Sequence, residues 1–206
     1  MRNEGILIVV SGFSGAGKGT LMKRLVEEYD GYALSISATT REPRPGEEDG
    51  REYFFLSREQ FEKRIVEHAL IEYAEYCGNY YGTPRDYVEK ELSGGRDVIL
   101  EIEIQGALKI KEQYPDALLL FVSTPDAAEL RRRLSGRGTE TEEVIQERLC
   151  RAAKEAEGIE AYDYIVINDD LETCVKELHG IIAAAHHAPG RNEEFIKKMR
   201  RELEGE

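Results

Sequence analysis

Gly12-Phe13-Ser14-Gly15-Ala16-Gly17-Lys18-Gly19-Thr20 joins the apolar run Ile6–Val10 to a helical pattern that begins at Lys18. A strand, a glycine-rich turn and a helix in this order are the context in which G-x-x-x-x-G-K binds phosphate. The glycines let successive backbone N–H groups point into one concavity, and the helix N-terminus adds positive potential there. We therefore predict a phosphate-binding loop over residues 14–20, rather than a glycine-rich turn that binds nothing.

Lys18 and Thr20 are the two side chains of this loop that matter for catalysis. The Lys18 ammonium group is a mobile point charge that can follow a phosphate as it leaves. Gly19 stands where many such loops place Ser or Thr, and the hydroxyl group comes one residue later, at Thr20. The sequence therefore predicts phosphate binding more firmly than direct ligation of Mg²⁺ by a hydroxyl group.

Short apolar runs alternate with helical patterns along most of the chain. Nearly continuous apolar runs are typical of strands buried on both faces of a parallel sheet. The pattern predicts an α/β fold with a doubly wound parallel sheet. The predicted strands are Ile6–Val10, Ala33–Ile36, Val98–Ile104, Ala117–Val122 and Tyr164–Ile167. The predicted helices are Lys18–Glu28, Gln105–Gln113, Pro125–Leu134 (with Thr124-Pro125 as its start), Thr141–Glu157 and Leu171–Ala185.

Residues 38–96 interrupt this alternation and divide the core into residues 1–37 and 97–185. The segment holds a polar, proline-bearing stretch, a helix that starts at a Ser57/Gln60 capping box, and the strand-like alternation Ile71–Tyr76. It is too long and too structured for a loop, so we predict an inserted subdomain. The charged residues 186–206 are expected to form a tail with a solvated helix rather than a partner-binding segment.

Composition limits the partners and the compartment. The 206 residues carry 28 basic and 41 acidic side chains, a net charge of −13, which disfavours binding to nucleic acids or anionic membranes. The three cysteines have no C-x-x-C spacing, and no apolar run approaches the length needed to span a membrane. We expect a single-domain cytoplasmic protein, either monomer or homodimer, in which all four histidines are structural or exposed.

A second anion site is indicated after the second predicted strand, in the stretch Ser35–Glu47. It contains Arg41 and Arg44 among hydroxyl groups and prolines, and two arginines in a stiff loop can hold a phosphate bidentately. A solvated polar loop is the alternative. The phosphate-binding loop upstream and the tyrosines Tyr53 and Tyr81 downstream favour the anion site.

Together these motifs resemble the guanylate kinase family. The sequence contains S-x-T-T-R-x-P-R-x-G-E, G-x-x-Y-x-F, I-E-Y-A, G-N-Y-Y-G-T, I-Q-G and R-G-T-E-T-E in the family's order, from about Ile6 to His179. The resemblance implies a transferase that moves the γ-phosphoryl group of ATP to GMP, and with it dGMP. It also implies a P-loop core, a GMP-binding insertion and a mobile lid over about residues 135–150.

The resemblance also implies roles for individual residues. ATP would bind at Ser14, Gly15, Ala16, Gly17, Lys18, Gly19 and Thr20, with Mg²⁺ as the cofactor near Thr20 and Glu101, held directly or through water. The GMP phosphate would bind at Arg41, Arg44, Tyr53 and Tyr81 with Glu47 beside them, and guanine at Ser37, Glu72, Thr83 and Glu103. The catalytic set would be Lys18, Arg41 and the lid arginines Arg133, Arg137 and Arg148.

The chemistry of guanine supports the two base-directed carboxylates independently. Guanine presents N1–H and N2–H₂ as neighbouring donors, which suit an acceptor-only side chain. The sequence has Glu101 and Glu103 where the family usually carries aspartates. Glutamate is one methylene longer than aspartate, so the Glu103 carboxylate would contact the base at a shifted position. Glu101, deeper on the strand, is the better partner for Mg²⁺ through water.

The lid prediction rests on Gly136 and Gly138 as hinge positions and on a Thr139/Glu142 capping box. Two roles are equally compatible with Asn168-Asp169-Asp170, which follows the last strand. The resemblance implies that it borders the adenine site, and the residue types also suit an ordinary helix cap. Two other functions stay as alternatives. One is a catalytically inactive guanylate-kinase-like module that binds phosphopeptides, and the other is a P-loop kinase for another nucleotide or a sugar phosphate.

Overall fold

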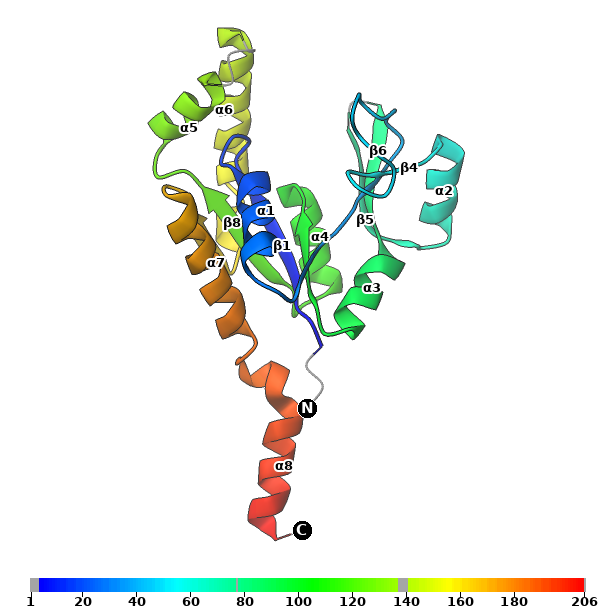
Figure 1. Ribbon diagram of the computed structural model, residues 1–206, viewed down its shortest axis with the longest axis vertical. Helices are drawn as coiled ribbons and strands as arrows, with labels where there is room; N and C mark the ends of the chain where they lie inside the picture. Colours follow the sequence, from blue (N-terminus) through cyan, green and yellow to red (C-terminus); the bar gives the residue numbers. More distant parts are fainter. Residues whose placement is uncertain (1–3, 77, 137–140, 206) are drawn as a thin grey trace.

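The computed structural model describes residues 4–76, 78–136 and 141–205, without the side chain of Tyr76. Its centre is a five-stranded sheet of parallel strands in the order β2-β7-β1-β8-β9 (Figure 1). The strands are β1 (Leu7–Gly12), β2 (Tyr32–Leu34), β7 (Asp97–Glu101), β8 (Leu118–Ser123) and β9 (Tyr164–Ile167). The predicted doubly wound α/β fold is confirmed.

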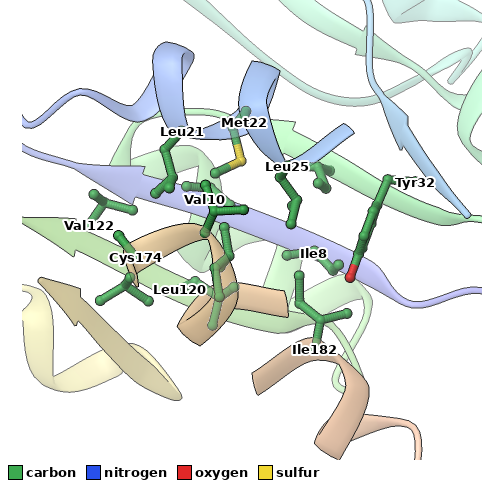
Figure 2. Packing of buried hydrophobic residues seen from close by; sticks show 14 of the residues in the cluster. Ile8, Val10, Leu21, Met22, Leu25, Tyr32, Leu120, Val122, Cys174 and Ile182 are labelled. Carbon is green, nitrogen blue, oxygen red and sulfur yellow. The ribbon is translucent and has the colours of Figure 1, made fainter. Parts of the chain in front are cut away.

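Helices cover both faces of this sheet because alternate strand residues point to opposite sides. Ile8 and Val10 of β1 face α1 (Lys18–Glu28) and α7 (Leu171–Ala185), and Figure 2 shows this cluster between sheet and helices. Leu7 and Val9 belong to the opposite cluster, against α3 (Arg85–Ser93) and α4 (Ile104–Gln113). The double burial explains why these strands are continuously apolar.

A second sheet of four strands, in the order β4-β3-β6-β5, lies to one side of the core (Figure 1). Phe61 of α2 packs with Ala38 and Leu70 in a small core of its own. The predicted Ser57/Gln60 capping box is present, with Gln60 N–H donating to Ser57 Oγ over 3.1 Å. The elements are β3 (Ala38–Thr39), β4 (Phe54–Phe55), α2 (Arg58–Val66), β5 (Leu70–Tyr76) and β6 (Asn79–Pro84).

On the other side of the core lie α5 (Ala127–Ser135) and α6 (Glu142–Ala156), and α8 (Glu193–Glu204) projects away from the body (Figure 1). The short 3₁₀ helices Ile159–Ala161 and Pro189–Asn192 precede β9 and α8. The predicted helix in the charged tail is therefore present, and its side chains are largely exposed. Within the described ranges, no helix has the length and apolar character needed to cross a bilayer.

Several predicted element ends were wrong. The strand expected over Val98–Ile104 ends at Glu101, which is its last residue paired with β1, and α4 begins at Ile104. The strand expected over Ala33–Ile36 runs from Tyr32 to Leu34, where its pairing with β7 stops. In both cases the apolar pattern continued past the last residue that pairs with the neighbouring strand.

The predicted helix start at Thr124-Pro125 was also wrong. Asp126 is the N-cap of α5, and its carboxylate accepts a hydrogen bond from Glu129 N–H over 2.7 Å. The Thr124 hydroxyl group instead donates to the backbone oxygen of Asp126. A short carboxylate satisfies the free N–H groups of the first turn at least as well as threonine does. Thr139 of the other predicted capping box lies outside the described residues, and Thr141 is the N-cap of α6.

Candidate active site

The phosphate-binding loop connects β1 to α1 in the predicted geometry. Gly15 and Gly17 have φ angles of 92° and 89°, a left-handed conformation that favours glycine. A β-carbon on Gly15 would lie 2.9 Å from Leu134 Cδ2 of α5, so the loop also lies close against that helix. Of the predicted loop residues, Ala16 is buried, whereas Ser14, Gly19 and Thr20 are exposed.

Lys18 is half-buried at the first position of α1, and its ammonium group is held by the loop itself. Lys18 Nζ donates to the backbone oxygen of Gly12 over 2.8 Å and to that of Phe13 over 3.3 Å. These two bonds to backbone oxygens position the Lys18 ammonium group beside the loop.

Glu101, the last residue of β7, lies beside the same loop. A β-carbon on Gly19 would be 3.8 Å from Glu101 Oε2, so the carboxylate faces the first turn of α1. Desolvation by the surrounding protein raises the pKa of Glu101 above its ordinary value, Lys18 lowers it in part, and Glu103 raises it further. Within the described residues, no three His, Cys, Asp or Glu side chains gather closely enough to hold a metal ion.

Arg41 and Glu47 form an ion pair in the loop that follows β3. Arg41 Nη2 donates to both carboxylate oxygens of Glu47 over 2.9 Å, and both side chains are less than one-fifth exposed. Glu47 also accepts from the backbone N–H of Arg44 over 2.7 Å, which is the main cause that holds the pKa of Glu47 below its ordinary value. This carboxylate therefore fixes the conformation of the loop that carries both arginines.

Two aromatic rings complete this arginine site. The guanidinium carbon of Arg41 lies 5.4 Å from the centre of the Tyr53 ring, within the range of a cation–π contact. The rings of Tyr53 and Tyr81 meet edge to face with centres 6.0 Å apart. Burial raises the pKa of Tyr53, so its hydroxyl group stays protonated and can donate. The structure thus brings Arg41, Glu47, Tyr53 and Tyr81 together, with Arg44 exposed beside them.

Glu72 and Thr83 form the second predicted group, on the neighbouring strands β5 and β6. The buried Thr83 hydroxyl group donates to Glu72 Oε1 over 2.8 Å. Glu72 Oε2 would lie 3.5 Å from a β-carbon on Gly106, so the carboxylate reaches the first turn of α4. Burial raises the pKa of Glu72, while the Thr83 hydrogen bond and Lys109 lower it in part. Ser37 is half-buried, and its backbone oxygen accepts from Phe54 N–H over 2.9 Å.

Glu103 pairs with an arginine of α6, whereas Glu72 pairs with Thr83. It is the N-cap residue of α4, and its Oε2 accepts from Arg151 Nη2 of α6 over 2.8 Å. The Glu103 side chain is 71% exposed, so this pair bridges the end of β7 and α6 at the surface. Sequence analysis missed Arg151, for which the only signal was its position one turn after Arg148.

The lid arginines occupy different places. Arg133 Nη2 donates to the backbone oxygen of Asn168 over 2.8 Å, and Nη1 lies 3.4 Å from that of Ala16, so Arg133 stands at the phosphate-binding loop. Arg148 is half-buried on α6. Arg137 lies outside the described residues.

Asn168 contacts the phosphate-binding loop directly, which sequence analysis did not predict. Its Nδ2 donates to the backbone oxygen of Ala16 over 2.8 Å, and the residue is buried. Asp170, the last residue of the triplet Asn168-Asp169-Asp170, is the N-cap of α7, because its side chain accepts from Thr173 N–H over 2.9 Å. The helix-cap alternative therefore holds for Asp170. The available signal for Asn168 was a polar residue at the carboxyl end of a core strand, where ligands bind in α/β sheets.

Comparison with known proteins identifies the family of this chain. The family model described as "Guanylate kinase" matches residues 4–185. The guanylate kinase of Desulfitobacterium hafniense (strain Y51) is 52% identical over 183 residues, which are 89% of this chain and 92% of that protein. The guanylate kinase of Caldanaerobacter subterraneus subsp. tengcongensis is 48% identical over 202 residues, 98% of each chain.

A solved structure gives the same result for the fold. The crystal structure of guanylate kinase from Anaplasma phagocytophilum superimposes with a TM-score of 0.71 and 34% sequence identity. The match covers 89% of this chain and 87% of that one. On its sequence, its sheet topology and its phosphate-binding loop, the chain belongs to the guanylate kinase family, whose reaction is the ATP-dependent phosphorylation of GMP to GDP.

Proposed function

We propose that the groups described above divide the reaction ATP + GMP → ADP + GDP between two phosphate sites and one base site. The ATP phosphates bind the backbone N–H groups of residues 14–20, and Lys18 leaves the Gly12 and Phe13 oxygens to follow the transferred group. The left-handed glycines and the position of Lys18 at the start of α1 support this role.

The GMP phosphate binds Arg41, Arg44, Tyr53 and Tyr81. Arg41 uses guanidinium donors that do not face Glu47, after its Nη1 releases the backbone oxygen of Glu42, to which it donates over 2.7 Å, and Glu47 holds the conformation of the loop. The ion pair means that little side-chain entropy is lost when the phosphate arrives. A GMP phosphate oxygen then attacks the γ-phosphorus in line, while the bond from that phosphorus to the β-bridging oxygen breaks.

Guanine binds at Glu72, with Ser37, Thr83 and Glu103 around it. Thr83 donates to one carboxylate oxygen of Glu72, which leaves acceptor capacity for the N1–H and N2–H₂ groups of guanine. Glu103 joins this site after releasing Arg151. The Glu72–Thr83 pair is the observation that carries the choice of GMP, because adenine has an acceptor at N1 and would face the carboxylate unfavourably.

The lid, residues 135–150, closes over ATP and brings Arg137 and Arg148 to its phosphates. Arg133, which donates to Glu129 and to the backbone oxygens of Ala16 and Asn168, supports the phosphate-binding loop. In this division the GMP-binding insertion is residues 38–96. Its strand β5 and its last helix, α3, place Ile71 and Val88 in the same core cluster as Leu7 and Val9, so these two elements join the insertion to the core.

Kinases that use ATP generally need a divalent metal, and Mg²⁺ is the ion we propose. The donors present suit it only in part, because Thr20 and Glu101 are two oxygen ligands at one edge of the site. Mg²⁺ keeps several waters and binds few protein carboxylates, so these residues would hold it partly through water. When bound, the ion would neutralise charge on the β- and γ-phosphates.

The test is an ADP-release assay with GMP, dGMP, AMP, UMP and a sugar phosphate as acceptors. We expect turnover with GMP and dGMP and little with the others. Lys18→Ala should keep the fold and lose turnover by about 10²–10³-fold, since one preorganised electrostatic group is removed. A preference for another acceptor, or near-normal turnover of folded Lys18→Ala, would refute the assignment.

A further inference from the structure

Three segments that are distant in the sequence meet at one backbone carbonyl of the phosphate-binding loop. The Ala16 oxygen accepts from Asn168 Nδ2 over 2.8 Å, and Arg133 Nη1 lies 3.4 Å from it. Arg133 also donates through Nη2 to the Asn168 backbone oxygen over 2.8 Å. Glu129, one turn earlier on α5, orients Arg133 by accepting from its Nε over 2.6 Å.

The contact between Asn168 and Ala16 lies in the protein interior and is closely packed. Asn168 is 5% exposed and Ala16 is fully buried, so their hydrogen bond is shielded from water. A β-carbon on Gly17 would lie 2.6 Å from Asn168 Nδ2, which shows that the amide group lies directly on the Gly17 backbone. Asn168 therefore both bonds to the loop and leaves room at position 17 for glycine alone.

The geometry of a peptide bond gives the contact a consequence for catalysis. In a planar trans peptide the C=O group of one residue and the N–H group of the next point in opposite directions. Holding the Ala16 oxygen on the outer side of the loop therefore directs the Gly17 N–H group to the inner side, where the ATP phosphates are proposed to bind. A loop free to rotate this peptide would lose one donor from the phosphate site.

We propose that Asn168 is a positioning residue for catalysis, which orients the Gly17 N–H group toward ATP through the Ala16 carbonyl and is itself held by Arg133. The inference rests on the proposed function of the loop, and it assigns Asn168 a part in phosphate binding for any nucleoside triphosphate. It differs from a role at the base of the nucleotide, where Asn168 would distinguish one base from another.

The experiment compares Asn168→Ala with Asp163→Ala as a matched control. Asn168 and Asp163 flank the two ends of β9, and each bonds the backbone of another segment, Asp163 accepting from Leu119 N–H over 2.8 Å. Steady-state kcat and KM are measured for ATP, GTP and GMP, together with the melting temperature. Wild-type turnover with GMP tests the function separately from the role of Asn168.

We expect Asn168→Ala to lower kcat/KM about tenfold to a hundredfold for both ATP and GTP, with the ATP/GTP ratio and the KM for GMP within twofold of wild type. Asp163→Ala should lower the melting temperature yet keep kcat/KM for ATP within twofold. If Asn168→Ala does not fold, Asn168→Asp keeps the shape, removes the donor and should show the same loss. Unchanged kcat/KM for ATP in a folded variant, or a loss confined to ATP, would overturn the proposal.

Discussion

Glu72 illustrates at the level of one residue how a site for a base opposes the stability of the fold. Its carboxylate is largely buried and accepts a hydrogen bond from the Thr83 hydroxyl group, and burial raises its pKa. A raised pKa means that the folded state binds a proton more tightly than the unfolded state does. Ionised Glu72 therefore opposes folding at neutral pH, and the proposed gain is recognition of guanine.

Glu72→Gln should lower kcat/KM for GMP about tenfold to a hundredfold, because one guanine donor loses its acceptor and an unpaired buried donor costs about 1–3 kcal/mol. Activity with AMP should not fall. Glu75→Gln on the same strand is the control, since Glu75 is half-exposed and pairs with Arg58. Steady-state assays with both acceptors check this, and a GMP/AMP ratio within twofold of wild type would show that Glu72 does not select the base.

The same variant has an expected pH dependence of stability. As pH falls through the raised pKa of Glu72, wild type takes up the proton and regains the stability that ionisation cost, whereas the neutral amide of the Glu72→Gln variant takes up no proton. Glu72→Gln should therefore melt at or above the wild-type temperature at pH 8, and this advantage should shrink as the pH is lowered. Melting curves from pH 8 to pH 5 check it, and an advantage that grows toward low pH would contradict the burial of this carboxylate.

Residues within a local motif could be predicted from the sequence, and residues that act across the fold could not. The phosphate-binding loop with Lys18 is encoded in nine consecutive positions, and Arg41 with Tyr53 lies in one short stretch. Asn168 meets Ala16 across 152 positions, and Arg133 meets it across 117. Such pairs depend on the order of strands in the sheet, which no local pattern contains.

At the level of elements, α6 presents one face to the active site. Arg148, Arg151 and Glu155 are spaced i, i+3 and i+7, so they share one side of the helix. Arg151 bonds Glu103 at the end of β7, and the Lys18 charge lowers the pKa of Glu155 in part, although burial raises it overall. Arg148 therefore lies on the side that faces the proposed ATP phosphates.

Arg148→Ala should lower kcat by about tenfold to a hundredfold and leave the KM for GMP within about twofold, because the arginine would act on the ATP phosphates in the closed lid. Lys154→Ala, an exposed basic residue on the same helix, is the control and should behave like wild type. Initial rates over a grid of ATP and GMP concentrations check the prediction. Unchanged kcat with a large rise in the KM for GMP would place Arg148 at the other substrate.

The type and order of the core elements followed from periodicity, and their ends did not. α1, α7 and β9 begin and end where predicted, since a glycine turn, an aspartate cap and a short apolar run mark them. The strand expected to reach Ile104 stops at Glu101, because Glu103 is already the N-cap of α4. The point at which the chain leaves the sheet is thus not described by the periodicity of a single segment.

For the whole molecule, the net charge of −13 opposes the binding of two anionic nucleotides. We propose that local positive charge offsets this repulsion, with Lys18 on α1, Arg41 and Arg44 in the loop after β3, Arg133 on α5 and Arg148 on α6. In this proposal, nucleotide binding depends on bringing these elements together around the two substrates.

The charged tail is the part of the molecule that this arrangement leaves out. None of the described residues of α8 is buried, and Phe195 and Leu203 are 48% and 80% exposed, so little apolar surface is covered by the rest of the chain.

Truncation after Asn192 removes α8 and keeps the bonds from Asn192 Nδ2 to the backbone oxygens of His186 and Ala188. We expect kcat, both KM values and the melting temperature to stay close to wild type, the last within about 2 °C. Kinetics, melting curves and light scattering on the full-length and truncated proteins check this. A large loss of activity or stability, together with a smaller mass in solution, would show instead that the apolar side of α8 joins two copies of the chain.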